Sequence, residues 1–188
     1  MTDKQKRMLE LLDGQILECK CCNLYENGRA KPYWTEKSKY LLLLEAPGKT
    51  ETETGEPLTG KTGQMFWDLM AEQGLTKEMF MVINSVNCRS MKGSRNIPPS
   101  EHHRSCCRKW LKKYFQVFQP DKVVLMGNPS IHTALGVWGV SKVAGELTNE
   151  EVFGIYTTVI KSYHPSAMIY GPDKKENIVK CIQKLKDY

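Results

Sequence analysis

Short apolar runs and helical repeats of apolar residues follow one another along this chain. An unbroken run such as Tyr40–Leu44 is typical of a strand that is covered on both faces. Strands that alternate with helices predict a three-layer α/β/α fold with a central, mostly parallel four-stranded sheet, and we expect one domain over residues 1–188. The predicted strands are residues 40–45, 80–84, 122–127 and 156–162. The predicted helices are residues 4–18, 63–74, 101–118, a helix opening at Asn128-Pro129, and 173–186.

The helical repeats also predict which side chains reach the core. Between the helices and strands, residues 19–39 and 89–100 lack any period and read as irregular loops, the second of them basic. The predicted buried positions are Met8, Leu9, Leu12 and Ile16 in the first helix, Met65, Phe66, Leu69 and Met70 in the second, Trp110, Leu111, Tyr114, Phe115 and Phe118 in the third, and Cys181 in the last.

Polar side chains stand where three of the predicted strands end. Glu45 follows the first strand and begins a turn with Pro47 and Gly48, Asn84 closes the second strand, and His164 follows the fourth. Carboxyl ends of parallel strands share one edge of the sheet, which is where open α/β sheets bind their ligands. We therefore expect the three side chains to converge on one site. Taken singly, each residue also fits a bland role: a solvated glutamate, a turn cap and a structural histidine.

Charge and composition narrow the class of partner. The net charge of +6 and the isoelectric point of about 8.9 favour a polyanionic partner such as nucleic acid. The N-terminus lacks the apolar core of a signal peptide, and no apolar run approaches the roughly 20 residues of a membrane span. We expect a cytoplasmic protein with no membrane contact that acts as a monomer.

Seven cysteines are many for a chain of this length. A disulfide framework is unexpected in a reducing compartment, so metal ligation is the better hypothesis. Thiolates suit both zinc and iron–sulfur clusters, and chemistry alone leaves the two open. The candidates are Cys19, Cys21, Cys22, Cys88, Cys106 and Cys107, whereas Cys181 lies on an apolar helix face.

Several short motifs occur in the order in which they appear in family 4 uracil-DNA glycosylases. They are Glu45-Ala46-Pro47-Gly48, Gly55-Glu56-Pro57 with Gly60 and Gly63, Asn84 with Cys88-Arg89, and His164-Pro165-Ser166-Ala167, together with Cys19 and Cys22 before Asn23-Leu24-Tyr25. The chain resembles that family over roughly residues 15–170. The resemblance implies the uracil-DNA glycosylase fold and a monofunctional enzyme that acts on DNA and hydrolyses the N-glycosidic bond of a flipped-out pyrimidine, with uracil as the family's base.

The resemblance further implies a [4Fe–4S] cluster. Its ligands would be Cys19, Cys22 and Cys88 with either Cys107 or Cys106. Counting forward from Pro98 favours Cys106, and counting back from Leu111 favours Cys107, which we prefer.

Catalytic and DNA-binding roles carry over by position. His164 would stabilise the departing base anion, and Glu45 would stabilise the sugar cation and position the water. Asn84, Leu58, Ala46 and Glu51 would surround the base. Arg89, Lys92, Arg95 and Ser166 are candidate phosphate contacts, and Met168, Ile169 and Tyr170 are candidates for the wedge that fills the vacated stack.

Departures from the family concern the substrate. The phenylalanine expected to stack on uracil is Leu58, the glycine before Glu45 is Leu44, the acidic residue after Glu51 is Thr52, and other branches carry an aspartate at Ala46. Leu58 offers no flat π face and leaves more volume. Asn84 pairs with uracil or, with its amide turned over, with cytosine. Three hypotheses follow: a uracil glycosylase, a glycosylase for a bulkier modified pyrimidine such as hypermodified cytosine in phage defence, and a non-catalytic iron–sulfur module that binds nucleic acid.

Overall fold

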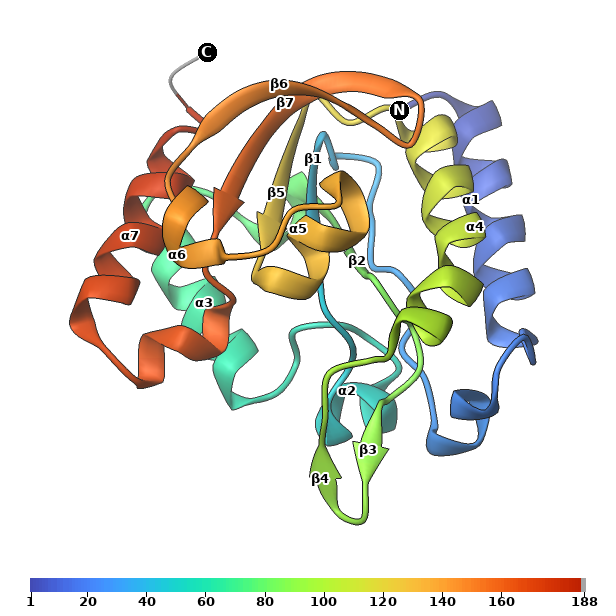
Figure 1. Cartoon of the computed structure of the whole chain (residues 1–188). Coiled ribbons are helices and arrows are strands. Elements are labelled where there is room, and N and C mark those ends of the chain that lie inside the picture. Colours follow the sequence, from blue (N-terminus) through green and yellow to red (C-terminus); the bar gives the residue numbers. More distant parts are fainter. Residues whose placement is uncertain (187–188) are drawn as a thin grey trace.

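A twisted central sheet organises the computed structural model, which describes residues 1–186 (Figure 1). Within these residues the sheet has five strands, in the order β2-β1-β5-β7-β6. The first four are parallel, and β6 runs antiparallel to β7. Their bounds are β1 Tyr40–Leu44, β2 Phe80–Asn84, β5 Lys122–Met126, β6 Leu147–Val152 and β7 Ile155–Ser162.

The prediction of four strands misses β6. Its sequence, LTNEEV, is largely polar and only its last residue is buried, so it carries no apolar run. Edge strands with a solvent-exposed face often contain many polar residues. Such a strand cannot be recognised from its own sequence, because it depends on pairing with a neighbouring strand. The predicted layers and the mostly parallel pairing are confirmed.

Side chains of β1 alternate between two apolar cores, one on each face of the sheet. Leu41 and Leu43 pack with the first and fourth helices, and Leu42 and Leu44 pack with the third and seventh. One face is therefore covered by α1, α4 and α5, and the other by α3 and α7 (Figure 1). The bounds of these helices are α1 Asp3–Leu17, α3 Lys61–Glu72, α4 Glu101–Phe118, α5 Asn128–Leu135 and α7 Pro172–Gln183.

Most predicted helix faces are buried as expected. The exceptions are Met8 and Met65, whose exposed fractions are 42% and 40%. Each lies one residue, or about 100° of helix rotation, before a fully buried neighbour and so turns away from the core. None of the helices among residues 1–186 is long and apolar enough to cross a membrane.

The two predicted loops contain more order than their sequences indicate. Residues 19–39 include the 3₁₀ helix η1 (Asn23–Asn27) and two isolated bridges, Arg29 to Cys88 and Tyr33 to Val82. The second bridge covers the outer edge of β2. The 89–100 loop folds into the hairpin of β3 (Met91–Lys92) and β4 (Arg95–Asn96), which projects from the body of the protein (Figure 1). The remaining short elements are α2 Lys49–Thr54, η2 Lys77–Met79, α6 Val140–Val143 and η3 Pro165–Ile169.

Candidate active-site cleft

A cleft of about 410 Å³ opens at the carboxyl edge of the sheet. Glu45, Asn84 and His164 all line it, together with Glu51 and Leu58. The chain thus brings together the three strand-end residues that the sequence placed at one edge. The lining also includes residues with no recognisable sequence signal: Thr62, Ser90, Asn96, Ile97 and Pro98.

Glu45 directly follows β1 and is half-buried at the edge of the cleft. Its backbone carbonyl accepts a hydrogen bond from the Val86 amide at 3.0 Å, which fixes the position of the residue. Its carboxylate makes no hydrogen bond or ion pair with other described residues. Burial raises the pKa of Glu45, and the positive charge of Arg104 opposes the rise. A carboxylate held in this way is available to a substrate.

His164 caps η3, and its ring orientation is set by the chain itself. Nδ1 accepts a hydrogen bond from the Ser166 amide at 3.3 Å and lies 2.9 Å from the Ser166 hydroxyl. Burial lowers the pKa of His164 to about 4, although the negative charge of Glu51 opposes the shift. The ring is therefore neutral at physiological pH. Because Nδ1 is an acceptor, the single ring proton is on Nε2, which is then a hydrogen-bond donor.

Close approach of β5 to His164 depends on Gly127. This glycine has φ +88°, and a β-carbon there would lie 3.0 Å from the β-carbon of His164. Such a contact is tighter than nine in ten real β-carbon contacts, and the backbone angle is strained for any other residue. Gly127 therefore lets the histidine sit directly over the end of the strand.

Asn84 ends β2 and is only 2% exposed, yet it lines the cleft. No hydrogen bond joins its side-chain amide to another described residue. A buried amide without a protein partner keeps one acceptor and two donors for a ligand. Within the described chain no group selects one of the two amide orientations.

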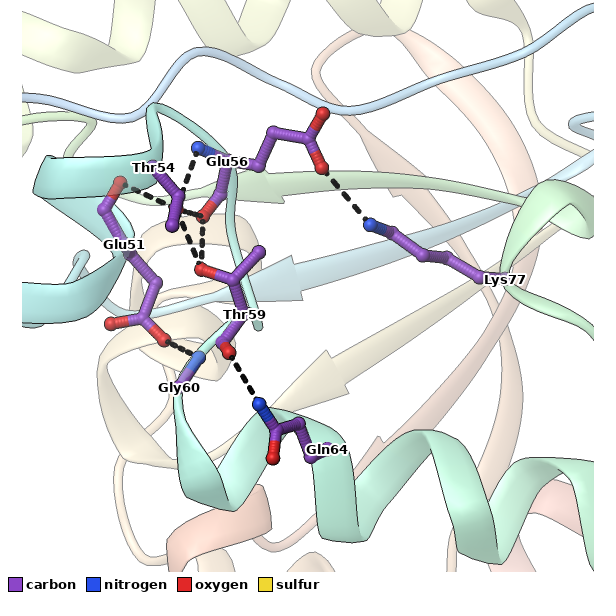
Figure 2. A network of polar contacts seen from close by, with 7 residues as sticks. All are labelled: Glu51, Thr54, Glu56, Thr59, Gly60, Gln64 and Lys77. Carbon is purple, nitrogen blue, oxygen red and sulfur yellow. Dashed lines mark hydrogen bonds and ion pairs between the residues drawn. The ribbon is translucent and has the colours of Figure 1, made fainter.

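Glu51 joins two loops that border the cleft. Its carboxylate accepts the Gly48 amide at 3.1 Å and the Gly60 amide at 2.8 Å. Figure 2 shows the bond from the Gly60 amide to Glu51 beside other polar contacts of the loop that precedes Gly60. In this loop the Thr54 and Thr59 hydroxyls lie 2.7 Å apart, and Lys77 forms an ion pair with Glu56 at 3.1 Å. Both carboxylate oxygens are thus occupied by backbone, and the residue acts as a loop clamp.

We expect Glu51→Ala to lower the free energy of unfolding by about 1–3 kcal/mol, because two backbone donors lose a charged acceptor. Urea unfolding followed by circular dichroism measures this difference. Glu53→Ala is the matched control, since Glu53 lies on the same short helix, is exposed and pairs only loosely with Lys49 at 3.8 Å. Equal stability of the two variants would contradict the clamp.

Leu58 occupies an unusual backbone conformation at the wall of the cleft. Its φ is +55°, a left-handed value that costs a leucine about 1–2 kcal/mol, and its side chain is 7% exposed. Gly63 permits this arrangement, because a β-carbon there would clash with the Leu58 carbonyl oxygen. Strained residues of this kind cluster at ligand sites.

Comparison with known proteins identifies the family. The model of the Uracil DNA glycosylase superfamily matches residues 32–186. The chain belongs to this superfamily. It is similar to the type-4 uracil-DNA glycosylase of Archaeoglobus fulgidus, with 26% identity over 94% of this chain and 92% of that protein. It is also similar to the type-4 uracil-DNA glycosylases of Saccharolobus solfataricus, at 25% identity over 95% of this chain and 85% of that protein, and Thermotoga maritima, at 24% over 98% and 96%.

In this uracil DNA glycosylase superfamily member the cysteines fall into two groups. Cys88 and Cys107 are buried together with Leu24 and Val86, and Cys22 packs against them. Burial first, and then the neighbouring thiols of Cys88, Cys22 and Cys19, raise the pKa of Cys107 to about 12. The Cys106 sulfur instead faces Cys21, with its Sγ 3.6 Å from the Cys21 carbonyl oxygen.

The candidate DNA contacts of the superfamily member lie around the cleft mouth. Lys92 and Arg95 are exposed on the projecting hairpin. Arg89 braces that hairpin through Asn96 Oδ1 at 2.7 Å and the Ser94 carbonyl oxygen at 3.3 Å. The Ser166 hydroxyl contacts His164. Their roles toward phosphate stay predictions.

The wedge hypothesis needs one correction. Met168 is 9% exposed and packs into the core beside α3 and α7, so it is not available to enter a base stack. Ile169 and Tyr170 are exposed at 56% and 79%. The apolar character of Met168 did not indicate whether its side chain faces the core or the solvent. The 3₁₀ turn of η3 points successive side chains in different directions.

Proposed function

We propose that the protein is a monofunctional DNA glycosylase that hydrolyses the N-glycosidic bond of uracil flipped out of DNA. The arrangement that carries the proposal is the cleft in which a buried, unpartnered Asn84 amide, a free Glu45 carboxylate and the Nε2–H of a neutral His164 all face the same space. The names of the relatives support the choice of uracil. The polyanionic partner favoured by the net charge of +6 is then DNA.

Charge separation in the reaction matches two of the groups that line this cleft, Glu45 and His164. Cleavage of a base–sugar bond leaves negative charge on the base and positive charge on the sugar. The Nε2–H of His164 donates to the base carbonyl oxygen as the negative charge develops there. The Glu45 carboxylate stabilises the cationic sugar and orients water for attack. Ala46 supplies no second carboxylate, so Glu45 alone carries this part of the reaction.

Base recognition falls to Asn84 and the loop around Leu58. The amide of Asn84 accepts from uracil N3–H and donates to uracil O4. Leu58 provides an aliphatic wall in place of an aromatic ring, which gives contact area without stacking. A flipped base costs a few kcal/mol to extract from a duplex and less from a single strand. The exposed Ile169 and Tyr170 would fill the space it vacates.

The thiols of Cys19, Cys22, Cys88 and Cys107 fit a [4Fe–4S] cluster. Three of them lie close enough to Cys107 to influence its pKa, whereas Cys106 turns toward Cys21. Among the described residues no group of three or more His, Cys, Asp or Glu is arranged around a single ion. A [4Fe–4S] cluster is held by cysteine thiolates of this kind. When bound, it would cross-link the 19–39 segment to the segment after β2 and to α4.

The test is base release measured by mass spectrometry from DNA that contains uracil, thymine, cytosine, hydroxymethylcytosine and glucosylated cytosine. We expect free uracil alone, with strand cleavage only after alkali because the enzyme is monofunctional. Asn84→Ala is the control that should lose release while keeping the fold. Release of a modified cytosine without uracil would overturn the substrate, and no release from the iron-loaded protein would overturn the enzymatic function.

A further inference from the structure

A buried arginine outside the cleft is connected to it in two ways. Arg104 lies on the first turns of α4, and its side chain is 8% exposed. Arginine is almost never buried unless its charge and its donors are satisfied. Nothing in the sequence distinguishes Arg104 from the exposed Arg108 one helical turn later. Its position is therefore a finding of the tertiary structure.

The guanidinium of Arg104 is held from two sides. Nη1 donates to the Pro99 carbonyl oxygen at 2.5 Å, and Nε and Nη2 donate to Glu101 Oε2 at 3.2 and 2.7 Å. Its carbon Cζ lies 5.5 Å from the ring centre of Trp138. A planar guanidinium group that is hydrogen-bonded in fixed directions has little freedom to move.

The first connection to the cleft is mechanical. The bonded carbonyl of Pro99 directly follows Ile97 and Pro98, which line the cleft. No secondary structure holds these residues, since β4 ends at Asn96 and α4 begins at Glu101. The bond from Arg104 is thus an anchor for this wall of the cleft.

The second connection is electrostatic. The positive charge of Arg104 lowers the pKa of Glu45 against the larger rise caused by burial. The carboxylate of Glu101 offsets only part of this charge, because its side chain is 59% exposed and is shared with Arg108 at 4.0 Å and His132 at 3.8 Å. The other titratable groups that line the cleft are Glu51, whose charge is bound to two backbone amides, and the neutral His164.

We propose that Arg104 is a positioning residue for base release, which anchors the 97–99 wall of the cleft and places a fixed positive charge on the Glu45 side of it. The inference rests on the proposed glycosylase function. It adds a cationic residue on α4 to the groups that the chain uses for catalysis, although Arg104 touches neither base nor sugar.

The experiment is the pH profile of single-turnover uracil release, from pH 5 to 9, for Arg104→Gln, Arg104→Lys and the matched control Arg108→Gln. Removing the charge should raise the pKa of Glu45, so the acid limb of Arg104→Gln should move to higher pH by about half a unit to one unit. That shift makes release about 3- to 10-fold slower below the limb. Arg104→Lys should restore the limb and raise the KM for DNA, because an ammonium cannot hold Pro99 and Glu101 together. Arg108→Gln should change neither.

The possible outcomes distinguish failure of the proposed Arg104 role from failure of the proposed glycosylase function. An acid limb of Arg104→Gln that coincides with that of the wild type would overturn the electrostatic part of the role, and an unchanged KM for DNA in Arg104→Lys would overturn the mechanical part, while uracil release by the wild type stands. A wild type that releases no uracil removes the function itself. Where Arg104→Gln does not fold, Glu101→Gln decides: the limb should move to lower pH, and an unmoved limb would refute the inference.

Discussion

Glu45→Gln is expected to slow uracil release by about 10²- to 10⁴-fold at pH 7.5 without unfolding the protein. The amide keeps the shape of the side chain but loses the negative charge that stabilises the sugar cation. Because the Glu45 carboxylate has no hydrogen-bond partner among the described residues, its replacement breaks no contact. Single-turnover release from a uracil-containing oligonucleotide measures the effect. Glu53→Gln, an exposed acidic residue nearby, is the control and should release uracil at the wild-type rate.

The pH dependence of the wild type follows from the same pair of residues. Glu45 has to be charged, and its pKa is raised by burial, so release should decline as the pH falls through that raised value. His164 has to be neutral, and its pKa of about 4 keeps it so over the whole working range. No decline is therefore expected near pH 6.5 from histidine titration, and Glu45→Gln should flatten the acid limb. A Glu45→Gln enzyme with wild-type rate would refute the catalytic assignment.

Cys107→Ser is expected to remove the proposed iron–sulfur cluster, with loss of the brown colour, of iron and of acid-labile sulfide. Cys107 is buried beside Cys88 and among the thiols of Cys19 and Cys22, so no other residue takes its place. Loss of a cross-link between segments distant in sequence should also lower the thermal unfolding temperature, by roughly 10 °C or more, because metal-binding energy is folding energy in such sites. Absorbance spectra and thermal scans of protein purified without oxygen measure both effects.

Cys106→Ser is the matched control for Cys107→Ser. It changes the neighbouring residue on α4 to the same side chain, but the Cys106 sulfur contacts the Cys21 carbonyl oxygen and is not buried with Cys88 and Cys107. It should retain the colour, the iron and the unfolding temperature. The reverse pattern, with Cys106 required and Cys107 dispensable, would show that the fourth ligand is assigned wrongly. Zinc in place of iron would refute the cluster itself.

Buried strands and strand-end residues were accessible to sequence reasoning. A strand covered on both faces is largely apolar, so β1, β2 and β5 can be recognised from their apolar runs. β7 is more polar and is recognised by its β-branched residues. Their parallel order then places their carboxyl ends together, which is why Glu45, Asn84 and His164 could be assigned to one edge before the fold was known. The family motifs added roles for these residues.

Contacts between segments far apart in sequence were not accessible in this way. β6 is polar and is a strand only because it pairs with β7. Glu51 lines the cleft, and the bonds from its carboxylate to the amides of Gly48 and Gly60 had no signal in the sequence. Met168 has the same apolar character as Ile169, yet it alone of the two is buried.

Sequence reasoning predicted the layer order, the edge of the sheet where the polar strand ends meet and the residue types found there. Hydrophobic periodicity and the residues at strand ends can be read from short segments of the sequence. The contact of the Cys106 sulfur with the Cys21 carbonyl oxygen, the bond from the Ser166 amide to Nδ1 of His164 and the effect of the Arg104 charge on the pKa of Glu45 came from the tertiary structure. Each of these depends on distances between side chains that are separated along the chain, and on burial, which no single segment determines alone.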